Sequence, residues 1–187
     1  MSDVLRPSPG ASPVGGEGAR DHAPRGWTRA YVALGSNRGD RRRTLDGAVA
    51  QLAADPRCRV RRTSRWIETA PVGGPSDQRA FYNGALELDT TLDAAELLAL
   101  LLAVEARFGR DRAREVRNGP RTLDLDLIVF GDETIDEPAL TVPHPRFAER
   151  LFVLAPLAEL VPELVPPGHT RTIAQLASEL GGVAVGS

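Results

Sequence analysis

GPRTLDLDLIVF, residues 119–130, is the most informative segment of this 187-residue chain. The apolar residues from 123 to 130 predict a strand, and side chains two apart on a strand point to the same face. Asp124 and Asp126 therefore share one face, while the leucines beside them share the other. Two adjacent carboxylates on an apolar strand repel each other and lose hydration, and a bound divalent cation relieves both costs.

Oxygen ligands without His or Cys indicate Mg²⁺, which usually keeps coordination positions for water and substrate phosphates. The same two aspartates also suit an exposed strand face with solvated carboxylates, a pattern that sheets tolerate without a metal. The pair alone leaves both interpretations open.

Arginines beside the two aspartates favour a phosphate site. Arg121 precedes Asp124 by three residues, and the preceding loop carries arginines at positions 110, 112, 114 and 117. One guanidinium group can bind two phosphate oxygens at once through parallel N–H bonds. All 23 basic residues are arginine, so any phosphate must be held by arginine, backbone N–H groups or metal. Taken singly, each arginine is also consistent with a surface charge paired with a neighbour such as Glu115.

The rest of the chain predicts an α+β domain. Apolar patterning indicates further strands and amphipathic helices, and Asp93 with Glu96 resembles a capping box that opens the second helix. Strands and helices interleave at hairpin-sized spacings, which predicts a ferredoxin-like α+β sandwich with helices packed on a mainly antiparallel sheet. The expected strands are residues 30–34, 58–63, 81–88 and 123–130, and the expected helices are residues 41–54, 93–108, 147–154 and 172–180.

Net charge, cysteine content and the absence of long apolar runs limit which partners and which cell compartment are expected. A formal net charge of −2 provides no field that would gather nucleic acid or an anionic membrane. Cys58 is the only cysteine, which excludes an internal disulfide, and no apolar run suits a membrane span or signal peptide. We expect a cytoplasmic monomer without nucleic-acid or membrane partners. Residues 1–26, rich in proline and glycine, predict a disordered leader before a single domain over residues 27–187.

A series of motifs along residues 30–160 resembles the 6-hydroxymethyl-7,8-dihydropterin pyrophosphokinase family. The motifs are YVALGSN (31–37), ETAPVG (68–73), FYN (81–83), GPRTLDLD (119–126), TVPHP (141–145) and RLFVL (150–154). The resemblance implies a ferredoxin-like fold and transfer of pyrophosphate from ATP to 6-hydroxymethyl-7,8-dihydropterin. AMP would be released, and the reaction is a step of folate biosynthesis.

The resemblance also implies a role for each matched residue. Asp124 and Asp126 would bind two Mg²⁺ ions that bridge the ATP phosphates. The phosphate oxygens would be held, as charge moves to the leaving AMP, by Arg110, Arg112 and Arg121. The pterin would lie between two aromatic rings and be read by an amide and nearby backbone, through Phe81, Phe152, Asn83, Thr69 and Val72. The nucleotide would be contacted by Leu127, His144 and Arg150.

Three positions depart from the family pattern. Many relatives carry an aromatic residue where this chain has Asn118, a proline where it has Ala70, and some carry an aromatic residue where it has Pro145. From the residues alone, Phe81 and Phe152 also suit an ordinary core. Two other functions remain open on the same basis: a two-metal transferase with another acceptor, and a small-ligand regulatory domain of the same architecture.

Overall fold

The structure is a computed structural model that describes residues 23–75, 77–111 and 119–183. Most of the expected leader therefore lies outside the described residues, and its disorder stays a prediction. Among the residues that are described, no helix is long and apolar enough to cross a membrane.

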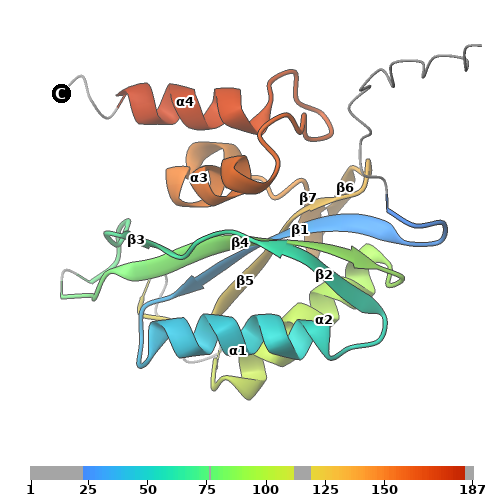
Figure 1. Cartoon of the computed structure of the whole chain (residues 1–187). Coiled ribbons are helices and arrows are strands. Elements are labelled where there is room, and N and C mark those ends of the chain that lie inside the picture. Colours follow the sequence, from blue (N-terminus) through green and yellow to red (C-terminus); the bar gives the residue numbers. More distant parts are fainter. Residues whose placement is uncertain (1–22, 76, 112–118, 184–187) are drawn as a thin grey trace, which may run out of the picture.

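A five-stranded sheet forms the centre of the fold (Figure 1). Its main path is β2 (Cys58–Thr63), β4 (Phe81–Thr90), β1 (Thr28–Ser36) and β5 (Asp124–Phe130), with the short β3 (Ile67–Thr69) also paired to β4. The pairings of β1 with β4, β1 with β5, and β2 and β3 with β4 are antiparallel. This strand order, with a helix after β1 and another after β4, confirms the predicted ferredoxin-like α+β fold.

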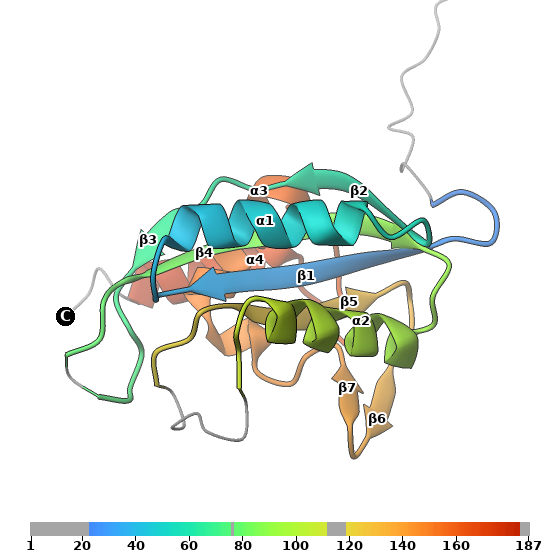
Figure 2. The same ribbon diagram turned by 90° about the horizontal axis from the view of Figure 1, so that it is seen from below.

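Two helices cover one face of the sheet, α1 (Arg41–Ala53) and α2 (Ala94–Arg107), as Figures 1 and 2 show. Asp40 caps α1 by accepting a hydrogen bond from the Arg43 N–H. The predicted capping box of α2 is present, because Asp93 and Glu96 accept from each other's backbone N–H groups. The apolar stripes of both helices pack against the leucines of β5 and the alternate side chains of β1 in the larger core.

The opposite face is covered by α3 (Leu151–Leu160), and α4 (Ile173–Val183) packs on α3 in the layer above it in Figure 1. The sequence predicted one short helix over residues 147–154, and this was wrong in its bounds. A 3₁₀ turn over Phe147–Glu149 comes first, and α3 then continues past Pro156. It continues because its apolar residues bury against the sheet, and such packing outweighs the low helix propensity of proline.

The sequence also missed two elements. One is β3, and the other is a hairpin of β6 (Ile135–Glu137) with β7 (Leu140–Val142), which extends from the body of the fold in Figure 2. Each of these strands has three residues, which is too short to show a period.

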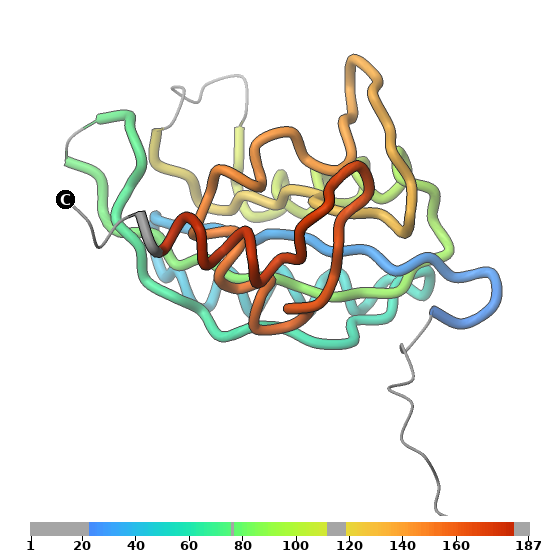
Figure 3. The backbone as a smooth tube through the Cα atoms, turned by 90° about the horizontal axis from the view of Figure 1, so that it is seen from above, coloured from blue at the N-terminus to red at the C-terminus, as the bar shows by residue number. Residues whose placement is uncertain are grey.

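Strand register places the two aspartates of β5. Asp126 pairs with Ala33 and Asp124 with Gly35, near the carboxyl end of β1. Both aspartates lie on the face that carries α3, while Leu125 and Leu127 point into the larger core on the other face, as the alternation predicted. Figures 2 and 3 show that the loop over residues 70–80, described at 70–75 and 77–80, lies at this same end of the sheet, opposite the first described residues.

Candidate active site

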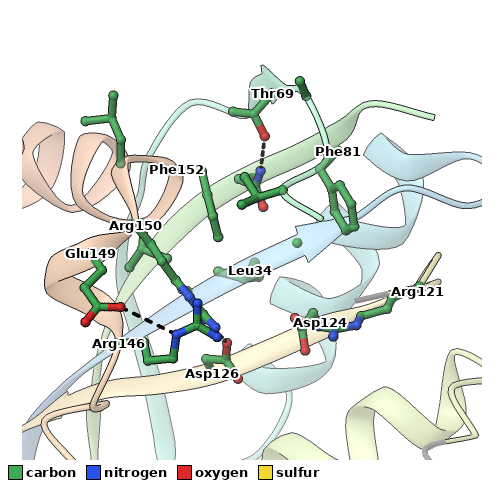
Figure 4. A pocket seen from close by; sticks show the side chains of 18 residues that line it. Leu34, Thr69, Phe81, Arg121, Asp124, Asp126, Arg146, Glu149, Arg150 and Phe152 are labelled. Carbon is green, nitrogen blue, oxygen red and sulfur yellow. Dashed lines mark hydrogen bonds and ion pairs between the residues drawn. The ribbon is translucent and has the colours of Figure 1, made fainter. Parts of the chain in front are cut away.

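A pocket of about 300 Å³ opens at this end of the sheet, between β1, β5, the β3–β4 connection and the beginning of α3 (Figure 4). The structure brings residues from five of the six motifs to its wall. The predicted site residues that line it are Thr69, Val72, Phe81, Asn83, Arg121, Asp124, Asp126, Arg150 and Phe152. Residues up to 120 positions apart in the chain, Ala33 and Val153, thus line one cavity.

One part of the pocket suits a flat ring. Phe81 and Phe152 lie on either side of the space in Figure 4, one from β4 and the other from α3. The Asn83 side chain is buried, and its Nδ2 donates to Thr69 Oγ1 at 2.7 Å. Its orientation is therefore fixed, which prepares an amide to read the hydrogen-bonding edge of a planar ligand.

Gly35 is a pocket residue whose role the sequence did not reveal. It lies on β1 opposite Asn83 in register, and a Cβ built there would stand 2.9 Å from Asn83 Oδ1. Any side chain would push the amide from its place. The glycine of the YVALGSN motif therefore allows β1 to approach the ring-binding part of the pocket closely.

The other part of the pocket carries the two aspartates. Arg121 Nη1 donates to Asp124 Oδ2 at 2.5 Å, and Arg110 Nη1 donates to Asp124 Oδ1. Burial alone would raise the pKa of Asp124, but the charges and hydrogen bonds of these two arginines outweigh it and hold the pKa below its ordinary value.

Asp126 lies in a different electrostatic environment. Its ion pair with Arg150 is long, with 3.8 Å between Nη1 and Oδ2. Burial, followed by the neighbouring charge of Asp124, raises the pKa of Asp126. The positive charge of a cation bound between the two carboxylates would lower the pKa of Asp126 and so oppose both causes of its rise.

Arg110 reaches Asp124 because a buried glutamate holds it. Glu105, in the last turn of α2, is 1% exposed. Its Oε1 accepts from Arg110 Nη1 at 2.6 Å and from the Leu125 backbone N–H at 2.8 Å. Sequence reasoning missed this residue, although a carboxylate on the apolar stripe of a helix is a signal that could have found it.

His144 lies beside the pocket rather than in its wall. Its backbone N–H donates to the Ile128 carbonyl at 2.9 Å, and its Nδ1 accepts from the Arg146 N–H at 3.1 Å. Burial lowers the pKa of His144, so the ring is neutral at pH 7. Because Nδ1 accepts, the proton of the neutral ring is on Nε2, which is then available as a donor.

Besides His144, two predicted residues do not line the pocket, and one lies outside the described residues. The Leu127 side chain is 4% exposed and packs in the larger core, so only its backbone could contact a nucleotide. Arg110 acts on the pocket through Asp124. Arg112 lies outside the described residues, as does Asn118. The pocket wall also includes Arg146 and Glu149, which the sequence did not single out and whose side chains lie 3.6 Å apart.

The sequence model of the 7,8-dihydro-6-hydroxymethylpterin-pyrophosphokinase (HPPK) family matches residues 31–162, which include each motif described above. The chain belongs to this family. A curated relative from Bacillus subtilis, 2-amino-4-hydroxy-6-hydroxymethyldihydropteridine pyrophosphokinase, is 52% identical over 131 residues, covering 70% of this chain and 77% of the relative. A relative of the same name from Synechocystis is 44% identical over 156 residues, covering 83% and 78%.

Solved structures agree in fold. The HPPK-DHPS triple mutant of Plasmodium falciparum, crystallised with STZ-DHP, matches with a TM-score of 0.65 at 15% identity over 82% of this chain. The chain spans 43% of the length of that two-enzyme protein, so the likeness concerns the fold of one part of it.

Family membership establishes the reaction class. The chain is a pyrophosphokinase, a transferase that moves a diphosphoryl group from ATP to the hydroxymethyl group of a dihydropterin in folate biosynthesis. The ATP co-substrate and the predicted function are confirmed at this level, while the role of each residue stays a prediction.

Proposed function

We propose that this transfer takes place in the pocket described above, with the pterin between Phe81 and Phe152 and the triphosphate beside Asp124 and Asp126. The observation that carries the proposal is the direct continuity of the two parts. An aromatic slot with a fixed amide opens onto a partly buried pair of carboxylates and two arginines. A pterin in the slot would thus point its hydroxymethyl group at the phosphates.

The donor set fits Mg²⁺. Asp124 and Asp126 offer oxygen ligands only, and no group of three or more His, Cys, Asp or Glu side chains in the described part of the chain could hold a metal alone. A site of this kind is completed by phosphate and water oxygens, as Mg²⁺ prefers. We propose two ions; bound there, they would neutralise phosphate charge and align the reacting groups.

Arginine supplies the rest of the phosphate site. Arg121 Nε is buried and has no hydrogen-bond partner among the described residues, which is costly unless a ligand oxygen completes it. We assign Arg121 and Arg110, together with Arg112, to the phosphate oxygens. We assign Arg150, which pairs with Asp126 at 3.8 Å, and the Nε2–H of His144 to the nucleotide.

The reaction is a substitution at the β-phosphorus. The hydroxymethyl oxygen of the pterin forms a bond to that phosphorus while the bond from it to the bridging oxygen on the α-phosphorus breaks. AMP leaves with the bridging oxygen, and the hydroxyl proton passes to solvent. The arginines hold the oxygens on which charge accumulates, so positioning and charge neutralisation lower the barrier.

The pterin would be recognised by the fixed amide of Asn83 and by the pocket wall around Thr69 and Val72. Asn83 would pair with the edge of the ring, together with backbone groups near Thr69 and Val72. The Val72 side chain is 71% exposed at the pocket wall, and a bound ring would cover it and remove apolar surface from water.

Identification of the nucleotide product tests the proposal. The protein is incubated with ATP, Mg²⁺ and 6-hydroxymethyl-7,8-dihydropterin, and the nucleotides are separated. AMP formed only in the presence of the pterin supports it. ADP would indicate an ordinary kinase with another acceptor, and no turnover would indicate a binding domain.

Variants test the residue assignments separately. Asp124→Ala and Asp126→Ala are expected to lose turnover while keeping the circular dichroism spectrum of the native fold. Near-normal rates in either variant would remove the metal assignment. Gel filtration of the same samples tests the prediction of a monomer.

A further inference from the structure

The turn that follows β1 contacts both parts of the pocket. Asn37, 2% exposed, is the second residue after Gly35. Its backbone N–H donates to the Arg121 carbonyl at 3.0 Å, and its Oδ1 accepts from the Arg121 N–H at 2.7 Å. Asn37 thus holds the backbone of the phosphate-site arginine from both directions.

The other end of the same amide holds the loop over residues 70–80. Asn37 Nδ2 lies 3.2 Å from both Gln78 Oε1 and the Arg79 carbonyl, and donates to each. Gln78 Nε2 in turn donates to the Gly73 carbonyl at 3.2 Å, beside Val72. This loop carries the rim of the ring-binding part, so its shape depends on the amide of Asn37.

We propose that Asn37 is a positioning residue that couples the pterin part of the site to the phosphate part. The inference rests on the proposed function and deepens it. The buried side chain of Asn37 joins Arg121 to the loop: its Oδ1 accepts from the Arg121 backbone, and its Nδ2 donates to the loop. A ligand that orders one side therefore lowers the cost of ordering the other, and linkage requires the effect to be reciprocal.

The chemistry explains why asparagine serves here. A carboxylate could accept from Arg121 but could not donate to the loop, and it would face the Gln78 and Arg79 oxygens with a negative charge. A smaller side chain would make neither the bond from the Arg121 N–H nor the two bonds to the loop. Asn37→Asp thus cuts the loop connection and preserves the acceptor for Arg121.

Arg41 offers a matched control. Its Nη1 donates to the Ala80 carbonyl at 2.6 Å and to Glu68 at 2.8 Å, so it also holds the base of the loop. Its described bonds go to the loop and not to Arg121. Arg41→Met is expected to loosen the loop without cutting its connection to the phosphate site.

Calorimetry measures the coupling directly. The bond that breaks joins the β-phosphorus to the oxygen that bridges it to the α-phosphorus, so α,β-methylene-ATP, in which a CH₂ group replaces that oxygen, occupies the site with MgCl₂ without reacting. The Kd of 6-hydroxymethyl-7,8-dihydropterin is measured with and without this analogue. Wild-type protein is expected to bind the pterin about 5-fold or more tightly when the analogue is present, the range typical of coupled sites.

Asn37→Asp is expected to bring this ratio close to one, whereas Arg41→Met weakens pterin binding by the same factor in both conditions. Gln78→Ala, at a partly exposed position, removes one of the two loop acceptors of Asn37 together with the bond to Gly73; it gives an intermediate ratio and serves if Asn37→Asp does not fold. A wild-type ratio in the folded Asn37 and Gln78 variants, or a ratio of one in an active wild-type protein, overturns the inference. Failure of wild type to make AMP would instead overturn the proposed function.

Discussion

A buried ionic network at the end of the sheet remote from the pocket allows a quantitative test of the fold. Arg29 on β1 donates to Glu87 and, at 2.5 Å, to Asp89, both on β4. Glu87 is 2% exposed and Asp89 is 0% exposed. Burial would lower the pKa of Arg29, but its hydrogen bond to Asp89 and the charge of Glu87 raise it above its ordinary value.

We predict a large loss of stability for Arg29→Met, which keeps most of the side-chain volume and removes the guanidinium. Breaking a buried ion pair from one side costs about 3–5 kcal/mol, because the remaining charge is left uncompensated. Arg62 still donates to Glu87 at 2.5 Å, so the lower value, about 3 kcal/mol, is expected. For a protein of this size that corresponds to a fall in Tm of about 6–12 °C.

Arg171→Met is the matched control, because Arg171 pairs with Glu179 at the surface and both side chains are 52% exposed. Such a pair contributes about 0–1 kcal/mol. Urea unfolding at pH 7, followed by circular dichroism, measures both variants against wild type. Equal losses in the two variants would refute the assignment of a stabilising buried network. The specific activity of the folded Arg29→Met protein should stay normal, since the network lies away from the pocket.

Three further substitutions separate binding, catalysis and stability. Gly35→Ala should displace the amide of Asn83 and remove one hydrogen bond to the pterin, worth about 1.5 kcal/mol. The KM for the pterin should therefore rise about tenfold or more, with little change in the KM for ATP. Steady-state kinetics measures both constants, and an unchanged pterin KM would contradict the prediction. Glu105→Gln should lower kcat about tenfold or more because Arg110 loses its charged support, and a normal kcat in a folded variant would count against that support. Asp93→Ala should cost about 1 kcal/mol of unfolding free energy through the lost helix cap and leave the kinetics unchanged, as thermal melts and rates would show.

The sequence was a good guide wherever the cause is local. The alternation in β5 placed Asp124 and Asp126 on one face because a strand has a period of two. The capping box at Asp93 was predicted because its partners are three residues apart. The motifs also identified most of the pocket wall, although the fold had to bring them together.

What the sequence could not supply depends on contacts between distant segments. Arg29 and its partners lie 58 and 60 positions apart, and Asn37 and Arg121 lie 84 apart. Glu105 stands out as a carboxylate on the apolar stripe of its helix, but its partners, the Leu125 N–H and Arg110, are brought to it only by the fold. No local pattern distinguishes these pairs from solvated surface charges, because the distance between partners is set by strand register.

Both ends of the sheet carry arginines and carboxylates on the same face, but the two ends differ in how closely these charges are paired. At the remote end, Glu87 accepts from Arg29 and Arg62, and Asp89 accepts from Arg29 through Oδ1, so each carboxylate has an arginine at hydrogen-bonding distance. At the pocket end, the ion pair of Asp126 is 3.8 Å long, and burial raises its pKa. A network built only for stability would have no reason to leave a partly buried carboxylate without an arginine at hydrogen-bonding distance. The incomplete compensation at Asp126 therefore indicates a charge whose proper partner arrives with the substrate, which is what transfer from a magnesium-bound triphosphate requires.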